Sequence, residues 1–313
     1  MKKALLTSLL LICAILFVPI QLEAAVKATN SEQIQSLNLL TQWNVVNGPL
    51  ELSGITHYKT NEFICVSDSN GGIYSFNFDF ADILKPENAP KSTNFRLLAN
   101  GIGWDLEGCV IAFDKIWCVN EGNSKIYVVD PDKFVKERVI STSITNFVSN
   151  CGLESLAYLP ESDEFVTCIE QPIDAKSNGI VDLSFFKSNH ITTELIKIKT
   201  IPYQIDKFEG ENIYRNGISE ITAWDADTLL IVERAVDLGQ RLPKSRIRIY
   251  AIDTDGMSKS QEGKPISKRL VYEYNSSFLP CNIEGLCRVP NTNLLLAVQD
   301  LPGMCCISVF MAQ

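Results

Sequence analysis

The sequence is poor in the residues that build metal and catalytic centres from nitrogen and sulfur ligands. It contains only two histidines, His57 and His190, and none of its 10 cysteines belongs to a CxxC pair. A structural zinc site needs four such ligands at close spacing, so none is expected. A GxSxG motif is also absent, and with it the nucleophile elbow of the α/β-hydrolases.

Basic residues are scarce as well. The chain has 28 Lys and Arg against 37 Asp and Glu, which gives a formal net charge of −9. Such a surface repels nucleic acid and anionic lipid, because their binding depends on lysine and arginine. No basic run or basic amphipathic helix is present. Nucleic acid is therefore not an expected partner, and a cation is the more natural one.

Long apolar runs are missing except at the N-terminus. There, Lys2 and Lys3 precede an apolar run from Leu5 to Ile20, and small residues at Ala24 and Ala25 follow. This order predicts a secretory signal peptide over residues 1–25. The alternative is an uncleaved anchor, but the run is short for a spanning helix, which needs about 20 residues. We expect a secreted or periplasmic protein without a membrane segment after cleavage, a flexible segment over residues 26–35 and one domain over residues 36–313.

Nine cysteines remain after the signal peptide is removed. Export permits disulfides, but an odd number leaves at least one thiol unpaired unless two chains are joined. Cys109 and Cys118 could face each other across a hairpin. Cys281 or Cys287 could reach one of the last two cysteines, Cys305 and Cys306, and the spacing leaves the pairing open.

What the sequence does contain is a repeat. Each unit opens with a small or acidic residue between apolar ones, continues through a turn signal, and returns along a short apolar strand that ends on an acid. Two further strand-like runs follow in most units. Units of this length with four strands each are typical of a β-propeller. The units begin at Ser53, Glu107, Glu154, Ser219 and Glu284, and their second strands end at Asp68, Glu121, Glu170, Glu233 and Asp300.

The two ends of the chain complement each other. The fifth unit lacks an outer strand, whereas the run from Leu37 to Val46 is a spare strand before the first unit. Adding this strand to the last blade closes the ring and hides the sheet edges that an open arrangement exposes. The sequence therefore predicts an all-β, five-bladed propeller of four-stranded blades rather than a six-bladed one, and we expect a monomer.

In a propeller the first strands of all blades line the central channel, so equivalent residues converge on one axis. Carboxylates that converge in this way raise each other's pKa. A hard cation such as Ca²⁺ relieves the repulsion, because it takes 6–8 oxygen ligands. Protonation and pairing with Arg234 are alternatives, and a single glutamate could also serve only to lock blades together. The residues expected to line the channel are Ser53, Asp68, Asp105, Glu107, Glu121, Glu154, Glu170, Ser219, Glu220, Glu233, Glu284 and Asp300.

These motifs resemble those of the phytase-like family, which is described as esterase-like activity of phytase. The resemblance spans nearly the whole mature chain in the family's order. It is carried by Leu52-Ser53-Gly54-Ile55, Asp105-Leu106-Glu107-Gly108, Gly152-Leu153-Glu154-Ser155-Leu156-Ala157, Gly217-Ile218-Ser219-Glu220 with Glu233-Arg234, and Asn282-Ile283-Glu284-Gly285. It implies a propeller that hydrolyses a small-molecule ester or phosphoester. The scarcity of basic residues argues against phytate as the substrate.

The expected site follows from both arguments. Glu107, Glu154, Glu220 and Glu284 would hold Ca²⁺. Glu107 or Glu154 would take a proton from water that the metal polarises, and Arg234 would stabilise the developing anion. The alternative is a secreted propeller without catalytic activity, which binds a protein or a carbohydrate and keeps its acids for structural reasons.

Overall fold

The computed structural model describes residues 33–45, 47–78, 91, 94–145, 147–172, 179–188, 194–210, 212–238, 244–254, 263–275, 281–301 and 304–313. The expected signal peptide and His190 lie outside these ranges. Of the segment 26–35 only the last three residues are described. Within that segment Ile34 is buried, and the amide of Gln35 donates to the carbonyl of Gln313 at 2.6 Å. None of the described segments forms a helix long and apolar enough to cross a bilayer.

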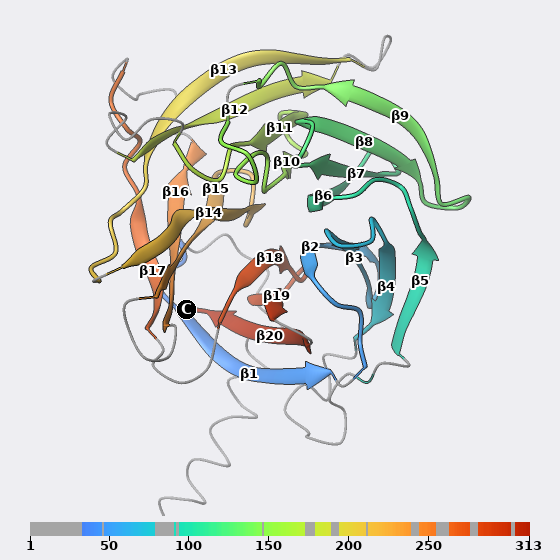
Figure 1. Ribbon diagram of the computed structural model, residues 1–313, viewed down its shortest axis with the longest axis horizontal. Coiled ribbons are helices and arrows are strands. Elements are labelled where there is room, and N and C mark those ends of the chain that lie inside the picture. The colour runs from blue at the N-terminus through green and yellow to red at the C-terminus, as the bar shows by residue number, and fades with distance from the viewer. Residues whose placement is uncertain are drawn as a thin grey trace, which may run out of the picture.

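The described residues form five four-stranded antiparallel sheets, arranged as blades around a central axis (Figure 1). Blade 1 consists of β2 (Leu52–Lys59), β3 (Glu62–Ser67), β4 (Ile73–Asn77) and β5 (Phe95–Ala99). Blade 2 consists of β6 (Leu106–Ala112), β7 (Lys115–Asn120), β8 (Lys125–Asp130) and β9 (Val135–Ser141). Blade 3 consists of β10 (Ala157–Leu159), β11 (Glu164–Thr167), β12 (Ile180–Ser188) and β13 (Leu195–Gln204). Blade 4 consists of β14 (Ile213–Ala223), β15 (Thr228–Asp237), β16 (Lys244–Asp253) and β17 (Arg269–Asn275).

Blade 5 combines the two ends of the chain. It contains β18 (Ile283–Arg288), β19 (Leu294–Leu301), β20 (Met304–Ala312) and, as its outer strand, β1 (Leu37–Val45). Strand β1 pairs antiparallel with β20, from Leu37 opposite Ala312 to Val45 opposite Cys305 (Figure 1). This confirms both the five blades and the closure of the ring by the N-terminal strand.

The apolar core is divided among the five interfaces between neighbouring blades, with one buried cluster in each. Strand β3 shows why the inner strands have few polar positions. Phe63 and Cys65 pack against blade 5, whereas Ile64 and Val66 pack against blade 2. Because both faces of the strand are buried, it reads as a continuous apolar run instead of an alternating one.

A glycine after the opening residue lets adjacent inner strands approach each other at the axis. A Cβ atom on Gly54 would lie 2.4 Å from the carbonyl oxygen of Glu107, and one on Gly108 would lie 2.4 Å from the amide nitrogen of Leu156. Distances this short are not tolerated between a Cβ atom and backbone. The amide of Gly108 uses the close approach to donate to the carbonyl of Glu154 at 2.8 Å.

The cysteines fill these cores, and no disulfide is present among the described residues. All nine after the expected signal peptide are buried free thiols. Cys109 and Cys118 do lie directly opposite each other on β6 and β7, but no disulfide joins them. Free cysteine packs as a small apolar side chain, which accounts for the presence of Cys65 and Cys109 in the inter-blade clusters.

Candidate functional site

Backbone hydrogen bonds at the exit of each second strand identify the equivalent residues of the five blades. In four blades an acidic residue at this exit donates its backbone amide to a carbonyl of the first strand's segment. The accepting carbonyl belongs to the residue just before the first apolar residue of that segment. The donating acids are Asp68, Glu121, Glu170 and Asp300. In blade 4 the partner of the corresponding residue, Gly217, is Arg234. Four acids and one arginine therefore occupy equivalent positions at one end of the channel. We call Asp68, Glu121, Glu170, Arg234 and Asp300 the mouth ring.

The sequence pattern grouped Glu233 with these acids, but the pairing places it one residue earlier, opposite Ile218. A shift of one residue sends a side chain to the other face of a strand. Glu233 is buried between blades 3 and 4, where it accepts hydrogen bonds from the Tyr203 hydroxyl at 2.8 Å and the Lys268 ammonium at 2.5 Å. It lies apart from the mouth ring and joins two blades.

Lys268 supplies the positive charge of this contact between blades 3 and 4, and its replacement tests the contact. Its ammonium also lies 2.9 Å from Asp206 and over the ring of Tyr250. Replacing Lys268 with methionine leaves the buried Glu233 without its cation, so the free energy of unfolding should fall by about 3–5 kcal/mol. Urea denaturation measures the loss.

The matched control is Lys125→Met, which removes an exposed lysine and should change stability by less than about 0.5 kcal/mol. Equal losses in the two variants would mean that the contact between blades 3 and 4 contributes nothing.

The opening residues of the units form a second ring. The register of the inner hairpins shifts at this point in blades 1, 2, 4 and 5. A β-bulge of this kind re-aims a side chain. The two serines hold neighbouring blades together: the Ser219 hydroxyl donates to the carbonyl of Ile283 at 2.7 Å, and Ser53 forms a hydrogen bond with Glu107. We call Ser53, Glu107, Glu154, Ser219 and Glu284 the inner ring.

Glu220, expected as a metal ligand, follows the inner ring by one residue and stands where three other blades have glycine. Its carboxylate accepts hydrogen bonds from the amides of Ile221, at 2.7 Å, and of Leu286 in blade 5. Burial raises the pKa of Glu220 well above its usual range. The structure thus brings Glu107, Glu154 and Glu284 to the mouth and directs Glu220 toward the next blade.

Arg234 is enclosed by glutamates from the two rings. Its Nη2 lies 3.2 Å from Glu170 and 3.8 Å from Glu154, and its Nη1 pairs with Glu284. The side chain of Asn282 bridges the last pair, accepting from Nη1 at 3.1 Å and donating to Glu284 at 2.7 Å. Burial alone would lower the pKa of Arg234, but the surrounding carboxylates outweigh this and raise it. The guanidinium is therefore a permanent charge of the mouth.

Two sets of carboxylates could hold a further cation. Ligand oxygens of Asp105, Glu107 and Glu121 lie within 4.8 Å of one another, and so do those of Glu121, Glu154 and Glu170. Glu121 belongs to both sets, and its Oε1 also accepts a hydrogen bond from the Gly152 amide at 2.9 Å. Oxygen ligands of this kind suit Ca²⁺.

Several carboxylate oxygens at the mouth are buried without a hydrogen-bond partner among the described residues. They are Asp68 Oδ1, Glu170 Oε2, Glu284 Oε2 and Asp300 Oδ1. An unsatisfied buried acceptor of this type costs about 1–3 kcal/mol, and more if it is charged. A bound cation or ordered water would satisfy them, so the donor set fits a hard cation.

The electrostatics indicate the same deficit of positive charge. Burial, followed by the charges of Glu154 and Asp68, raises the pKa of Glu107 well above its usual range. Burial and Glu170 do the same for Glu154, against the opposing effect of Arg234. Burial together with Glu51 and Asp300 raises the pKa of Asp68 to about 7. Without a metal, some of these carboxyl groups therefore hold protons near neutral pH.

Four residues at the mouth were not among the residues expected to line the channel. Glu51 and Arg215 have positive φ angles of 53° and 48°, a conformation that bulky residues adopt at a cost and often near functional sites. Cys151 hydrogen-bonds Glu170, and Asn282 orders Glu284. Glu51 and Asn282 could have been found from their position, since both align with Asp105 in the repeat, but Arg215 and Cys151 do not occupy such a position.

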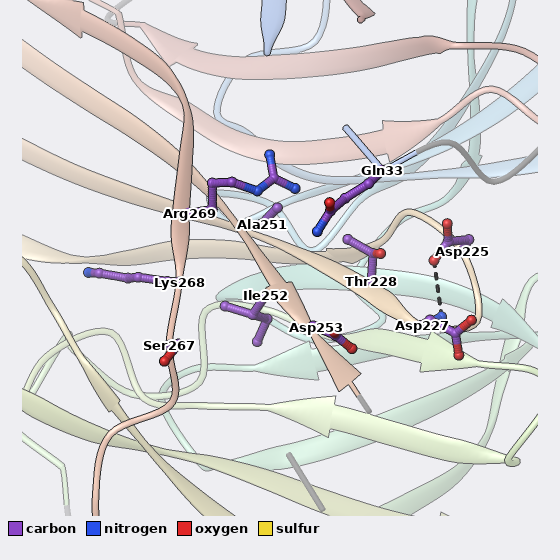
Figure 2. Close-up of a pocket in the computed structure, with 10 residues that line it drawn as sticks. All are labelled: Gln33, Asp225, Asp227, Thr228, Ala251, Ile252, Asp253, Ser267, Lys268 and Arg269. Carbon is purple, nitrogen blue, oxygen red and sulfur yellow. Dashed lines mark hydrogen bonds between the residues drawn. The ribbon is translucent and has the colours of Figure 1, made fainter. Parts of the chain in front are cut away.

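A pocket of about 410 Å³ lies elsewhere, at the other end of blade 4 (Figure 2). Its lining includes Asp225, Asp227 and Thr228, and the Asp227 amide donates to the Asp225 carboxylate at 3.0 Å. Thr228 begins β15, and Arg234 follows six residues later, about 20 Å along the strand. The pocket is therefore separate from the mouth.

Fold and site define the class of the protein: a five-bladed β-propeller with an acidic channel mouth that contains one buried arginine. Within this class the chain belongs to the phytase-like family, described as esterase-like activity of phytase, whose sequence profile matches residues 50–300. No curated protein matches the sequence significantly.

Several solved structures are similar to this chain at a low level. They include the nidogen/laminin complex (12% identity, 79% of this chain and 72% of that one, TM-score 0.40) and streptogramin B lyase (10%, 90% and 100%, TM-score 0.41). The glutaminyl cyclase of Myxococcus xanthus is a third (9%, 90% and 100%, TM-score 0.45). Likeness at this level says nothing about the activity of this chain.

Proposed function

We propose that the channel mouth binds Ca²⁺ and, with it, hydrolyses a small carboxylic or phosphoric ester. The observation that supports this most is the clustering of ligand oxygens of Asp105, Glu107 and Glu121 within 4.8 Å of one another. Acids of three blades, each with a buried carboxylate oxygen that has no partner among the described residues, surround this cluster. The membership of the phytase-like family supports the reaction class.

The residues of the mouth have distinct roles in this proposal. Asp105, Glu107 and Glu121 are the ligands for Ca²⁺, which when bound supplies a Lewis acid for the ester oxygen and for water. Glu154 accepts the proton from the attacking water, because its pKa is raised above that of an ordinary carboxylate, which makes it a stronger base. Arg234 holds Glu154 in place and has an Nε–H without a partner in the described part of the chain, which can donate to the developing oxyanion.

The charge of the mouth limits the substrate. Most of its ionisable groups are acids, and both Nη atoms of Arg234 already pair with glutamates. A polyphosphorylated molecule normally requires several free lysines or arginines. The proposed substrate is therefore a monoester with little negative charge, and the signal peptide expected over residues 1–25 supports a location in the periplasm or outside the cell.

One observation favours the second function, binding of a carbohydrate without catalysis. Trp104, next to Asp105, is 74% exposed, whereas indole side chains are usually well buried. An exposed aromatic ring at a binding surface can stack on the apolar face of a ligand.

Metal analysis and hydrolysis separate the two functions. The purified mature protein should contain Ca²⁺, and it should hydrolyse p-nitrophenyl acetate or p-nitrophenyl phosphate in the presence of Ca²⁺ but not of EGTA. A metal-free protein that gains no thermal stability from Ca²⁺ and cleaves neither compound would contradict the proposal. Binding of oligosaccharides by that protein, lost in Trp104→Ala, would then support the second function.

A further inference from the structure

The mouth ring is nearly symmetric in position but not in charge. The backbone hydrogen bonds that define it place Arg234 where the other four blades have aspartate or glutamate. A side chain of opposite charge at one of five equivalent positions changes how the remaining acids are neutralised. The guanidinium contacts Glu154, Glu170 and Glu284.

The guanidinium does not satisfy these three glutamates completely. Glu170 is fully buried and Glu284 is 6% exposed, yet Oε2 of each has no partner in the described part of the chain. Glu170 offers a ligand oxygen within 4.8 Å of those of Glu121 and Glu154. A planar guanidinium donates along fixed directions, whereas Ca²⁺ accepts 6–8 oxygens in a flexible arrangement. The arrangement of the carboxylates thus suits a divalent cation better than it suits the guanidinium of Arg234.

We propose that the guanidinium of Arg234 occupies a second divalent-cation site, formed by Glu121, Glu154 and Glu170, and so fixes the number of metal ions that the mouth binds. Glu284 and Asn282, which contact the other end of the guanidinium at Nη1, border this site. The inference rests on the proposed function only in taking Ca²⁺ as the cation of the other set, Asp105, Glu107 and Glu121.

The test is the stoichiometry of Ca²⁺ binding to the whole mature protein, measured by calorimetry after removal of metal. Arg234→Gln should bind one Ca²⁺ ion more per chain than the parent protein. Arg234→Lys is the matched control: it keeps a positive charge at the same position and should bind the same number as the parent. Arg234→Gln should also gain more thermal stability from Ca²⁺ than the parent does.

The remaining outcomes are distinguishable. Equal stoichiometry in Arg234→Gln and the parent overturns the inference. If Arg234→Gln is unfolded without metal, folding on addition of Ca²⁺ supports the inference, and failure to fold at millimolar Ca²⁺ overturns it, because calcium then does not replace the guanidinium. A parent that binds no Ca²⁺ together with an Arg234→Gln variant that binds one refutes the proposed function but supports the second site.

Discussion

Replacing Glu121 with glutamine should weaken Ca²⁺ binding by about 10- to 100-fold. Glu121 is the one residue shared by both sets of clustered ligand oxygens, so its charge acts on a cation in either position. Loss of one charged contact costs about 1.5–3 kcal/mol, which corresponds to this range of affinity. The amide oxygen of glutamine can still accept the hydrogen bond that the Gly152 amide donates to Glu121. Calorimetric titration of the metal-free variant measures the change.

The same substitution should leave the metal-free protein at least as stable as the parent, because it removes one of several repelling charges. Glu220→Gln is the control, since Glu220 is equally buried but binds backbone amides away from the mouth. It should leave the affinity for Ca²⁺ unchanged. An unchanged affinity in Glu121→Gln, or an equal loss in Glu220→Gln, would contradict the assignment of the ligands.

The architecture could be predicted from the sequence because every blade of a propeller repeats the same sequence pattern. Each blade has the same hairpin, and the glycines that recur after the opening residue are required by the close approach of the inner strands, as at Gly54 and Gly108. The spare strand at the N-terminus could be assigned to the last blade, because that unit lacks an outer strand. A misinterpreted strand in one blade can be recognised in such a pattern, because the other four blades show which strand belongs there.

The site could be predicted only in part, because its function depends on which face each residue occupies. Aligning the units by their acids placed Glu220 and Glu233 among the channel residues. Strand pairing aligns Glu220 with the glycines and Glu233 with Ser67 and Asn120. A difference of one residue reverses the direction of a side chain, and bulges change this register without any mark in the sequence.

The role of Arg234 shows the same limit. From the sequence, Arg234 is a basic residue directly after Glu233. It could therefore be interpreted as a neighbour of the acids that is available to bind an anion. Only the pairing with Gly217 shows that it replaces an acid of the ring, and only the contacts show that its Nη atoms already bind glutamates. Composition gives the number of charges, and the fold decides which of them neutralise each other.

The metal-free protein should lose stability as the pH rises from about 4 to about 7, and Ca²⁺ should abolish this loss. The pKa of Asp68 rises to about 7 in the folded chain from an ordinary value of 3.8, because of burial and the charges of Glu51 and Asp300. Between these two values the folded state binds more protons than the unfolded state. Stability therefore decreases with increasing pH across this window, the reverse of a carboxylate held in a salt bridge. The pKa values of Glu107 and Glu154 are also raised, so these two groups add to the loss.

Calcium and protons then compete for the oxygens of Glu107 and Glu121, two proposed ligands whose pKa values are raised, so Ca²⁺ binding should release about one proton or more per chain near pH 6. Titration in two buffers of different ionisation enthalpy measures the number released. In Asp68→Asn the loss of stability between pH 4 and 7 should be smaller, since its carboxyl no longer titrates, whereas Asp132→Asn, which changes an exposed aspartate outside the mouth, should keep the parent's profile. Binding of Ca²⁺ without proton release, or stability that increases over this pH range in the absence of metal, would mean that the carboxylates of the mouth are already neutralised by the protein itself.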